Sequence, residues 1–413
     1  PAGRQPLQGG SMNRKPPHRV TRRTSILRRT LLPVALLVPA AWMGLATPAR
    51  ASVTLVDNDK VKIDMEMRLM MWATYTGPDL IPGVNSAPPP PQDENIEDFF
   101  VRRARLLLRA RLSDSLDIVF QMGQDNLGSK VLRDDAGFRF KDAAINYRKN
   151  DALQVIVGQF KVPFLRQNLA SGFNQLLVDR SFVTGLRPGV EASRDEGGQI
   201  WGNAGGLQYR VGVFDGSDQE DTNTNSSLRG AARVSYNWFT KETGFGYTGT
   251  TIGDKKILQI GGQADAQNGR TDARDDPGFT TQARAYRAWA ADIYYDQPFA
   301  SRWALTTEGA WVERRDDYDA VGLATKSTAA GYAQAGLLLP WNVGPGRLQI
   351  AGRWEEIQTD RGGVDASTRA RTLGLNWYAK GHDRKIQFDH GTVTERPTDL
   401  DDNFYRLSVV ATF

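Results

Sequence analysis

Residues 99–112 read FFVRRARLLLRARL, and the alternation within this stretch decides the fold class. Successive side chains of a β-strand point to opposite faces. The even positions then place apolar side chains on one face, namely Ala104, Leu106, Leu108, Ala110 and Leu112. The odd positions place four arginines on the other, namely Arg103, Arg105, Arg109 and Arg111. A strand with one apolar and one charged face fits a wall between lipid and water.

The same alternation recurs along the chain in segments of about ten residues, which suit strands that cross a membrane at a tilt. After Ala51 no apolar run approaches the length that a membrane-spanning helix needs. We therefore predict an all-β protein, an antiparallel transmembrane β-barrel. Sixteen strands are predicted, near residues 61–75, 99–112, 115–125, 138–149, 152–160, 193–203, 207–215, 229–239, 255–267, 284–297, 301–314, 327–340, 346–358, 370–380, 383–394 and 403–413.

The connections between these segments alternate between short and long. Short turns such as 113–114 and 150–151 are followed by long connections such as 126–137 and 161–192. Outer-membrane barrels have short periplasmic turns and long outer loops, so both chain ends are predicted on the periplasmic side. The connection 240–254 is the exception, because it is long where a short turn is due.

Aromatic residues near the predicted strand ends indicate the girdles that mark the two membrane interfaces. They are Trp72, Tyr75, Phe99, Trp238, Trp303, Trp311, Trp341, Trp377, Tyr378 and Phe413. A terminal phenylalanine on an alternating strand is typical of outer-membrane proteins.

The first 51 residues carry nine Lys and Arg residues and no acidic residue. A basic stretch, Arg14 to Arg29, precedes the apolar stretch 31–46 and a small-x-small site at 49–51, which is the plan of a secretory signal peptide. A membrane anchor is the alternative, but sixteen residues with two prolines are short for a span. We predict upstream residues and a cleaved signal peptide over 1–51, starting at Met12, and an outer-membrane barrel over 52–413.

The basic charge of the chain resides in this leader. The remaining residues comprise 43 basic and 47 acidic side chains, a net charge of −4. A nucleic-acid partner is therefore not expected.

Five short motifs in order resemble the phosphate-selective porin O/P family of bacterial outer-membrane porins. They are FFVRRAR at 99–105, DAAINY at 142–147, VGQFKVPF at 157–164, GVFDG at 212–216 and LGLNWY at 373–378. The resemblance covers most of residues 60–413. It implies a sixteen-stranded barrel, a homotrimer, a constriction loop folded into the pore, and basic residues along the lumen.

The long connection 161–192 is the candidate for that loop, because it is too apolar for a solvated segment. Inward packing would narrow the lumen of a wide barrel; packing against a neighbouring subunit is the alternative. Arg166 and Arg180 are its cations, and Arg180 falls where the family pattern also has arginine. Phosphate-selective members carry lysine near the position of Asn168, so phosphate specificity does not carry over with the resemblance.

The arginine face of strand 99–112 is expected to line the lumen, because each arginine in hydrocarbon would cost about 2–4 kcal/mol at the membrane midplane. Arginine is always charged, and its planar fork suits phosphate and carboxylate oxygens. The four side chains could form a path for small anions. Alternatively they pair with Asp117, Glu308 or Glu355 and support the wall.

No catalytic or cofactor motif is found. Cysteine is absent, and G-x-S-x-G, H-E-x-x-H and P-loop patterns are missing. Clusters of acidic residues such as 218–221 could bridge divalent cations to lipopolysaccharide, or could be simple solvated loop tips. We expect no enzyme activity, no cofactor and no metal site.

The sequence is compatible with three functions. The first is a passive porin that prefers small anions such as phosphate or another oxyanion. The second is a porin of the same build with weak selectivity. The third is a barrel that does not conduct and serves in adhesion or envelope structure.

Overall fold

The computed structural model describes residues 52–58, 60–77, 95–132, 137–186, 194–216, 226–271, 283–318, 326–361, 363–397 and 400–413. All of them belong to one compact unit, residues 49–413. The predicted leader and the acidic cluster 218–221 lie outside the described residues. No helix in the described part of the chain has the length and apolar character required to cross a membrane.

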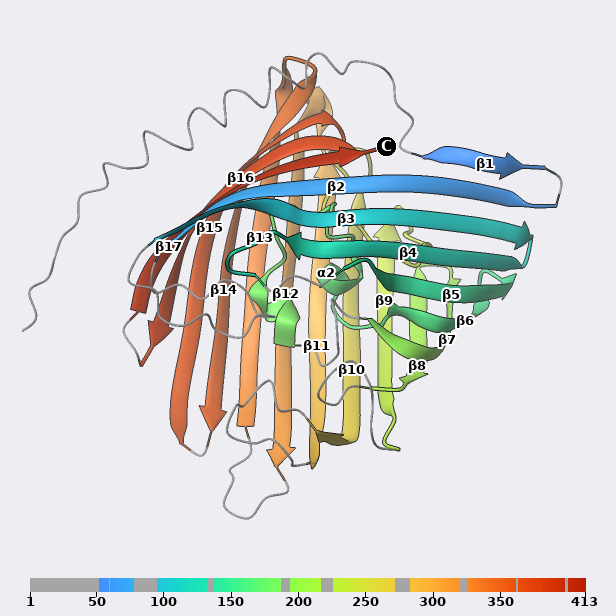
Figure 1. Cartoon of the computed structure of the whole chain (residues 1–413), viewed down its shortest axis with the longest axis horizontal. Coiled ribbons are helices and arrows are strands. Elements are labelled where there is room, and N and C mark those ends of the chain that lie inside the picture. Colours follow the sequence, from blue (N-terminus) through green and yellow to red (C-terminus); the bar gives the residue numbers. More distant parts are fainter. Residues whose placement is uncertain are drawn as a thin grey trace, which may run out of the picture. The chain divides into compact units, whose positions relative to one another are not determined.

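Sixteen antiparallel strands close into a barrel, in which each strand pairs with the next and β17 pairs with β2 (Figure 1). The bounds are β2 (Lys62–Thr76), β3 (Ile96–Ser113), β4 (Leu116–Leu127), β5 (Arg139–Asn150), β6 (Leu153–Lys161), β7 (Arg194–Ala204), β8 (Leu207–Phe214), β9 (Arg229–Phe239), β10 (Ile257–Thr271), β11 (Ala283–Pro298), β12 (Ala304–Tyr318), β13 (Lys326–Val343), β14 (Gly346–Arg361), β15 (Val364–Lys380), β16 (Arg384–Arg396) and β17 (Leu400–Thr412). Each corresponds to one predicted segment, so the predicted strand count is correct.

Three kinds of short element accompany the barrel. Strand β1 (Val53–Asp57) pairs with the start of β2. The helical turns α2 (Arg166–Leu169) and η1 (Phe182–Leu186) lie in the long connection between β6 and β7. A further turn, η2 (Ala300–Arg302), joins β11 to β12.

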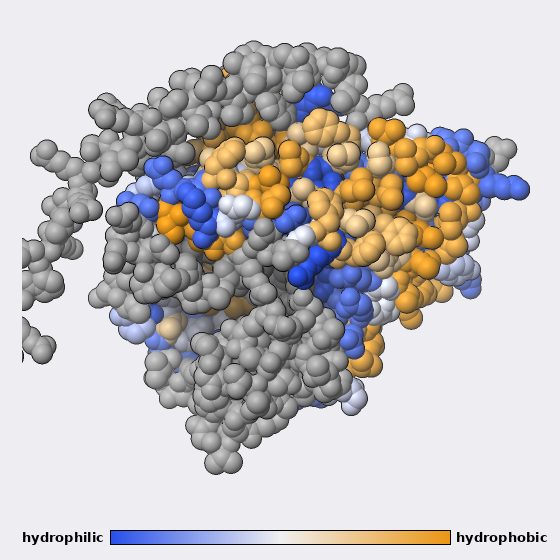
Figure 2. All heavy atoms as spheres, in the orientation of Figure 1, coloured by the Kyte–Doolittle hydropathy of each residue, from blue (hydrophilic) through white to orange (hydrophobic). Residues whose placement is uncertain are grey.

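The strands carry polar side chains inward and apolar side chains outward, which is the inverse of a soluble protein. In β8, Gln208 and Arg210 are 2% and 1% exposed, whereas Val211 and Val213 are 55% and 53% exposed. Figure 2 shows a broad hydrophobic area over the outer surface of β2 to β5. Lipid is the solvent that such a surface requires.

Most of the predicted girdle aromatics lie outward, but two do not. Phe99, Trp311 and Trp341 are exposed, as a girdle requires. Trp72 and Tyr378 are only 3% exposed, so their assignment to a girdle was wrong. Trp72 packs with other apolar side chains beneath the constriction loop, and the hydroxyl of Tyr378 donates to Gln349 Oε1 at 2.7 Å.

A charge introduced on the outer surface should be costly in proportion to its depth. Leu375 is 46% exposed between Leu373 and Trp377 on the outward face of β15. Leu375→Arg should lower the free energy of unfolding from lipid vesicles by about 2–4 kcal/mol, measured by urea titration of tryptophan fluorescence. Val343→Arg, beside the short turn that joins β13 to β14, should cost much less. Equal costs for the two variants would contradict the predicted membrane position.

Candidate functional site at the pore constriction

The connection between β6 and β7 folds into the barrel, as predicted. Its described part, residues 162–186, is called the constriction loop here. Leu165, Leu176 and Leu177 are fully buried, although residues at such positions in a solvated loop would be exposed. The predicted residues 187–192 lie outside the described part of the chain.

Carboxylates of the barrel wall hold the backbone of this loop. The backbone N–H of Arg166 donates to Asp292 Oδ2 on β11 at 2.9 Å. The N–H of Val178 donates to Asp389 Oδ2 on β16 at 2.9 Å. The N–H of Phe182 donates to Glu355 Oε2 on β14 at 2.8 Å. Buried amides without partners are costly, so these three acids fix the loop to three separate strands.

Arg166 is fully buried, and both of its terminal amino groups donate hydrogen bonds. Its guanidinium donates to Glu242 Oε2 at 2.6 Å and to Gln259 Oε1 at 2.9 Å. The guanidinium carbon also lies 3.7 Å from the ring centroid of Tyr294 and 4.6 Å from that of Tyr247. Arg166 therefore lies within the packed interior, and its role is to hold the loop in place.

Glu242 and Tyr247 belong to the connection between β9 and β10, which is long where the alternation of short and long connections predicts a short turn. Residues 240–256, called the inward turn here, enter the lumen from the short-turn end and pack against the constriction loop. The N–H of Gly249 donates to the carbonyl of Asn174 at 2.9 Å. A Cβ atom on Gly249 would lie 2.7 Å from that oxygen, so only glycine permits this approach.

The inward turn reaches across the barrel. Phe245 packs against Trp201 on β7, and the N–H of Thr251 donates to Asp296 on β11 at 2.7 Å. His382, in the turn between β15 and β16, lies 2.8 Å from the carbonyl of Thr250 through its Nε2. Burial, reinforced by nearby Lys385, lowers the pKa of His382 to about 3. The ring is therefore neutral at ordinary pH, and Nε2 carries the proton that it donates to Thr250.

These two inward segments fill the lumen unequally. Inward-facing Gln259, Gln349 and Asn376, on β10, β14 and β15, are all 0% exposed. On the opposite wall, the side chains of Arg109 and Arg111 are 52% and 58% exposed. Among the described residues, the arginine face of β3 is therefore open at its periplasmic end, whereas Arg105 and Arg103, further along the strand, are 7% and 6% exposed.

Each of the four predicted wall arginines has an acidic neighbour. Arg103 lies 3.3 Å from Asp179, Arg105 lies 2.6 Å from Asp125, Arg109 lies 3.2 Å from Glu66, and Arg111 lies 3.2 Å from Asp117. Asp117 therefore pairs with an arginine of the barrel wall, which is one of the alternatives that the sequence left open. Glu308 instead accepts from the side chains of Gln167 and Gln334, and Glu355 accepts from the loop and from Arg353.

A further arginine, which the alternation did not indicate, joins this group. Strict alternation would turn Arg102 toward lipid, with Ala104. The pairing of β2 with β3 skips Arg102, because Met70 faces Arg103 and Met71 faces Val101. This bulge turns Arg102 inward, where its guanidinium lies 3.4 Å from Asp179 and 4.7 Å from the ring centroid of Trp72.

Asp179, near the end of the constriction loop, is surrounded by positive charge. The surrounding guanidinium groups are called the arginine cluster here, and they are Arg102, Arg103, Arg180, Arg353 and Arg406. Burial alone would raise the pKa of Asp179, but the neighbouring guanidiniums, led by Arg102 and Arg103, outweigh it and hold this pKa well below its usual range. Asp179 is therefore ionised at any physiological pH.

Two members of the arginine cluster have no carboxylate within 4.0 Å among the described residues. Arg180 donates to the carbonyls of Gln167 and Ala170, at 3.0 and 2.7 Å. Arg406 lies with its guanidinium carbon 4.0 Å from the ring centroid of Phe404. Arg180 was predicted from the sequence, whereas Arg406 was missed because only barrel closure brings β17 beside β2 and β3. Such groups can offer donors to a passing anion.

Within the described ranges, no group of three or more His, Cys, Asp or Glu residues is arranged to hold a metal ion.

The ion pair of Arg166 with Glu242 should control how far the lumen is filled. In Glu242→Gln, a buried guanidinium loses its charged partner, which typically costs about 3–5 kcal/mol. We expect the inward turn to loosen, with a lower melting temperature and a larger single-channel conductance in planar bilayers. Glu313→Gln, on the outer surface beside Trp311, is the matched control. Unchanged conductance and stability in Glu242→Gln would show that this pair does not hold the two segments together.

Comparison with solved structures shows the same fold in other outer-membrane channels. An anion-selective porin from Comamonas acidovorans has a TM-score of 0.56 at 11% identity, over 86% of this chain and 100% of that chain. The outer-membrane channel DcaP of Acinetobacter baumannii has a TM-score of 0.54 at 12% identity, over 86% and 99%. OmpT of Vibrio cholerae in its trimer form has a TM-score of 0.53 at 9% identity, over 86% and 100%.

A curated relative from Aquifex aeolicus, described as an uncharacterized protein, is 27% identical over 260 residues. The match covers 59% of this chain and 59% of that relative. The model of the family described as phosphate-selective porin O and P matches residues 84–404, well over half of the chain. The closed sixteen-stranded barrel, the inward constriction loop and this match agree, and the chain belongs to the phosphate-selective porin O and P family.

Proposed function

We propose that this protein lets small solutes diffuse passively through the bacterial outer membrane, with a preference for anions. The observation that carries the proposal is the arginine cluster at the constriction. Five guanidiniums surround Asp179, and two of them, Arg180 and Arg406, lack a carboxylate partner among the described residues. Excess positive charge at the narrowest part of a water-filled path attracts anions and repels cations.

The four wall arginines of β3 line the route by which an anion would reach the arginine cluster. Arg109 and Arg111 are exposed to the lumen at the periplasmic end, and Arg105 and Arg103, which are largely buried in their ion pairs, lie nearer the constriction. An anion can exchange one guanidinium for the next, because each site binds it without enclosing it. The acids beside these arginines keep each site weak, which favours passage over capture.

The chemistry of the cluster suits small oxyanions, since a guanidinium fork matches two oxygens of a phosphate or carboxylate. Asn168, at the position where phosphate-selective members carry lysine, donates to the carbonyl of Thr184 at 3.1 Å and is fully buried. It adds no charge to the passage. We therefore propose a general preference for small oxyanions rather than a site selective for phosphate.

Weak selectivity is the second candidate, and the acidic partners of Arg105, Arg109 and Arg111 favour it. In that case the wall charges cancel and the pore sorts solutes mainly by size. As part of the proposal, the leader over residues 1–51 directs export and is cleaved, and the mature barrel assembles as a homotrimer.

Ion selectivity in planar bilayers tests the proposal directly. The reversal potential across a KCl gradient should show chloride preferred over potassium, and added inorganic phosphate should reduce the chloride current. Arg180→Gln combined with Arg406→Gln should reduce the anion preference by several-fold, because each change removes an unpaired positive charge. Arg287→Gln, which removes an exposed arginine from the outer surface, should leave selectivity unchanged.

Three results would contradict parts of this proposal. Absence of ion current from the purified protein would favour a barrel that does not conduct. Current without anion preference would favour the weakly selective porin. Unchanged selectivity in the double variant would assign Arg180 and Arg406 a purely structural role.

Asp179 gives a prediction that depends on pH. Asp179→Asn should increase the anion preference, because it removes the carboxylate that lies within 4.0 Å of both Arg102 and Arg103. A depressed pKa means that the carboxylate of the native protein stays charged while pH falls through the ordinary carboxyl range. The difference in reversal potential between the variant and the native protein should therefore be as large at about pH 4 as at about pH 7. A difference that disappears at the lower pH would show that Asp179 titrates normally.

A further inference from the structure

The outer surface of the barrel carries a band of charge at the long-loop ends of β12 to β15. Toward the long-loop end of β15, the outward-facing side chains change from the apolar Leu375 and Leu373 to the charged Arg371 and Arg369. Along β12, Trp311 is followed by Glu313, Arg315 and Asp317. The outer ends of β8 and β9 differ, since they present Val213, Gly230 and Ala232 outward.

Exposed tryptophans mark the lower edge of this band. Trp289, Trp311 and Trp354, on β11, β12 and β14, are 50%, 49% and 42% exposed. The ring of Trp311 lies across Gly331 of the neighbouring strand, where a Cβ atom would come within 2.9 Å of it. Tryptophan settles at the headgroup level of a membrane, so the charges beyond it lie among the headgroups of the outer leaflet.

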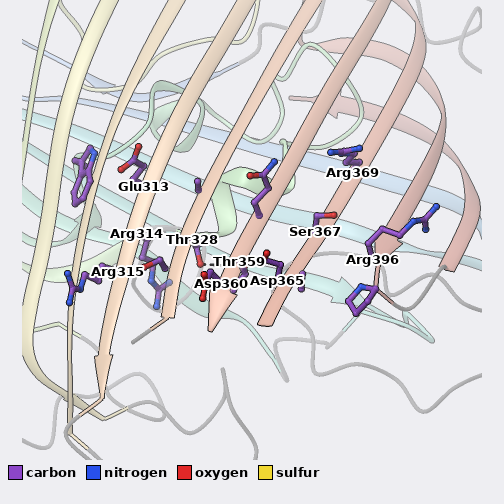
Figure 3. Close-up of a pocket in the computed structure, with 16 residues that line it drawn as sticks. Glu313, Arg314, Arg315, Thr328, Thr359, Asp360, Asp365, Ser367, Arg369 and Arg396 are labelled. Atoms are coloured by element: carbon purple, nitrogen blue, oxygen red, sulfur yellow. Dashed lines mark hydrogen bonds between the residues drawn. The ribbon is translucent and has the colours of Figure 1, made fainter. Parts of the chain in front are cut away.

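A groove follows the band across the long-loop ends of β11 to β16 (Figure 3). Its volume is about 640 Å³. One cross-strand row, which runs from Trp289 through Glu313, Ala329, Gln358 and Ser367 to Arg396, forms its floor. Arg315 and Arg369 line it as well, and Arg371 lies two residues from Arg369 on the same face of β15, next to the groove. The groove thus combines guanidinium, hydroxyl, amide and aromatic groups along one row of paired residues.

The arginines of the band remain available to a ligand. The side chains of Arg315 and Arg369 are each 59% exposed, although Asp317 lies 3.0 Å from the first and Glu356 lies 2.8 Å from the second. Exposed ion pairs of this kind contribute only about 0–1 kcal/mol, so a phosphate can compete for the guanidiniums while the acids keep them oriented. Arg371 is exposed beside Trp354 and has no hydrogen-bond or ion-pair partner among the described residues.

We propose that this groove binds the phosphorylated headgroup of an outer-leaflet glycolipid of the lipopolysaccharide type. Phosphate oxygens are bound by Arg369 and Arg371, the sugar hydroxyls lie along the polar row, and the acyl chains descend beside Trp354 and Leu373. The position of the band fixes the depth, and the guanidinium forks match the phosphate. This surface site is separate from the passage through the lumen.

Binding of purified rough-type lipopolysaccharide to the full protein in detergent tests the proposal, with native mass spectrometry as the readout. The native protein should bind the glycolipid, and should bind it much more weakly after enzymatic removal of its phosphates. Arg369→Gln combined with Arg371→Gln should weaken binding roughly tenfold or more, because two charged hydrogen-bond donors are lost. Lys149→Gln, at the exposed periplasmic end of β5, is the matched control and should bind as the native protein does.

Several outcomes would overturn the proposal. Equal binding by the double variant and the native protein would exclude these arginines, and equal binding of the dephosphorylated glycolipid would exclude phosphate recognition. A change in the mass of the oligomer would show instead that a second copy covers this sector. Unaltered conductance and heat-modifiable gel mobility would show that the double variant is folded. If it fails to fold, Arg371→Gln alone is used, since Arg371 has no partner to lose in the described structure.

Discussion

A sheet in hydrocarbon cannot keep a free edge, because each unpaired backbone N–H or C=O would cost several kcal/mol. Pairing of β17 with β2 removes that edge, and the rest of the structure depends on it. Closure creates a lumen wide enough to hold two inward segments. It also brings Arg406, near the end of the chain, beside the arginines of β3.

Carboxylates determine how the closed lumen is used. Asp292, Glu355 and Asp389 accept backbone N–H groups of the constriction loop and hold it against β11, β14 and β16. Their negative charge is thereby committed to the packed side. The arginines of β3 border the open side, where Arg109 and Arg111 remain exposed. The loop is thus attached to strands other than the one whose arginines remain exposed.

The sequence was informative wherever the period of two held. All sixteen strands could be located, because one face of each had to be apolar in lipid. Arg102 could not be assigned, since a bulge in the pairing of β3 reverses its direction without any local signature. Trp72 and Tyr378 were misassigned because they were assigned by their nearness to strand ends, whereas alternation places them on the inward face with buried Met70 and Asn376. Arg406 depended on a contact between the two ends of the sequence, which periodicity does not report.

The inward turn has a consequence for the order of assembly. It connects β9 to β10, in the middle of the chain, whereas the last pairing joins the first and last strands of the barrel. Before that pairing forms, the curved sheet is open along its whole length and the turn can settle onto its concave face together with the constriction loop. After it forms, the same residues would have to enter through an already narrowed mouth. Packing of both buried segments is therefore sterically easiest while the sheet is still open.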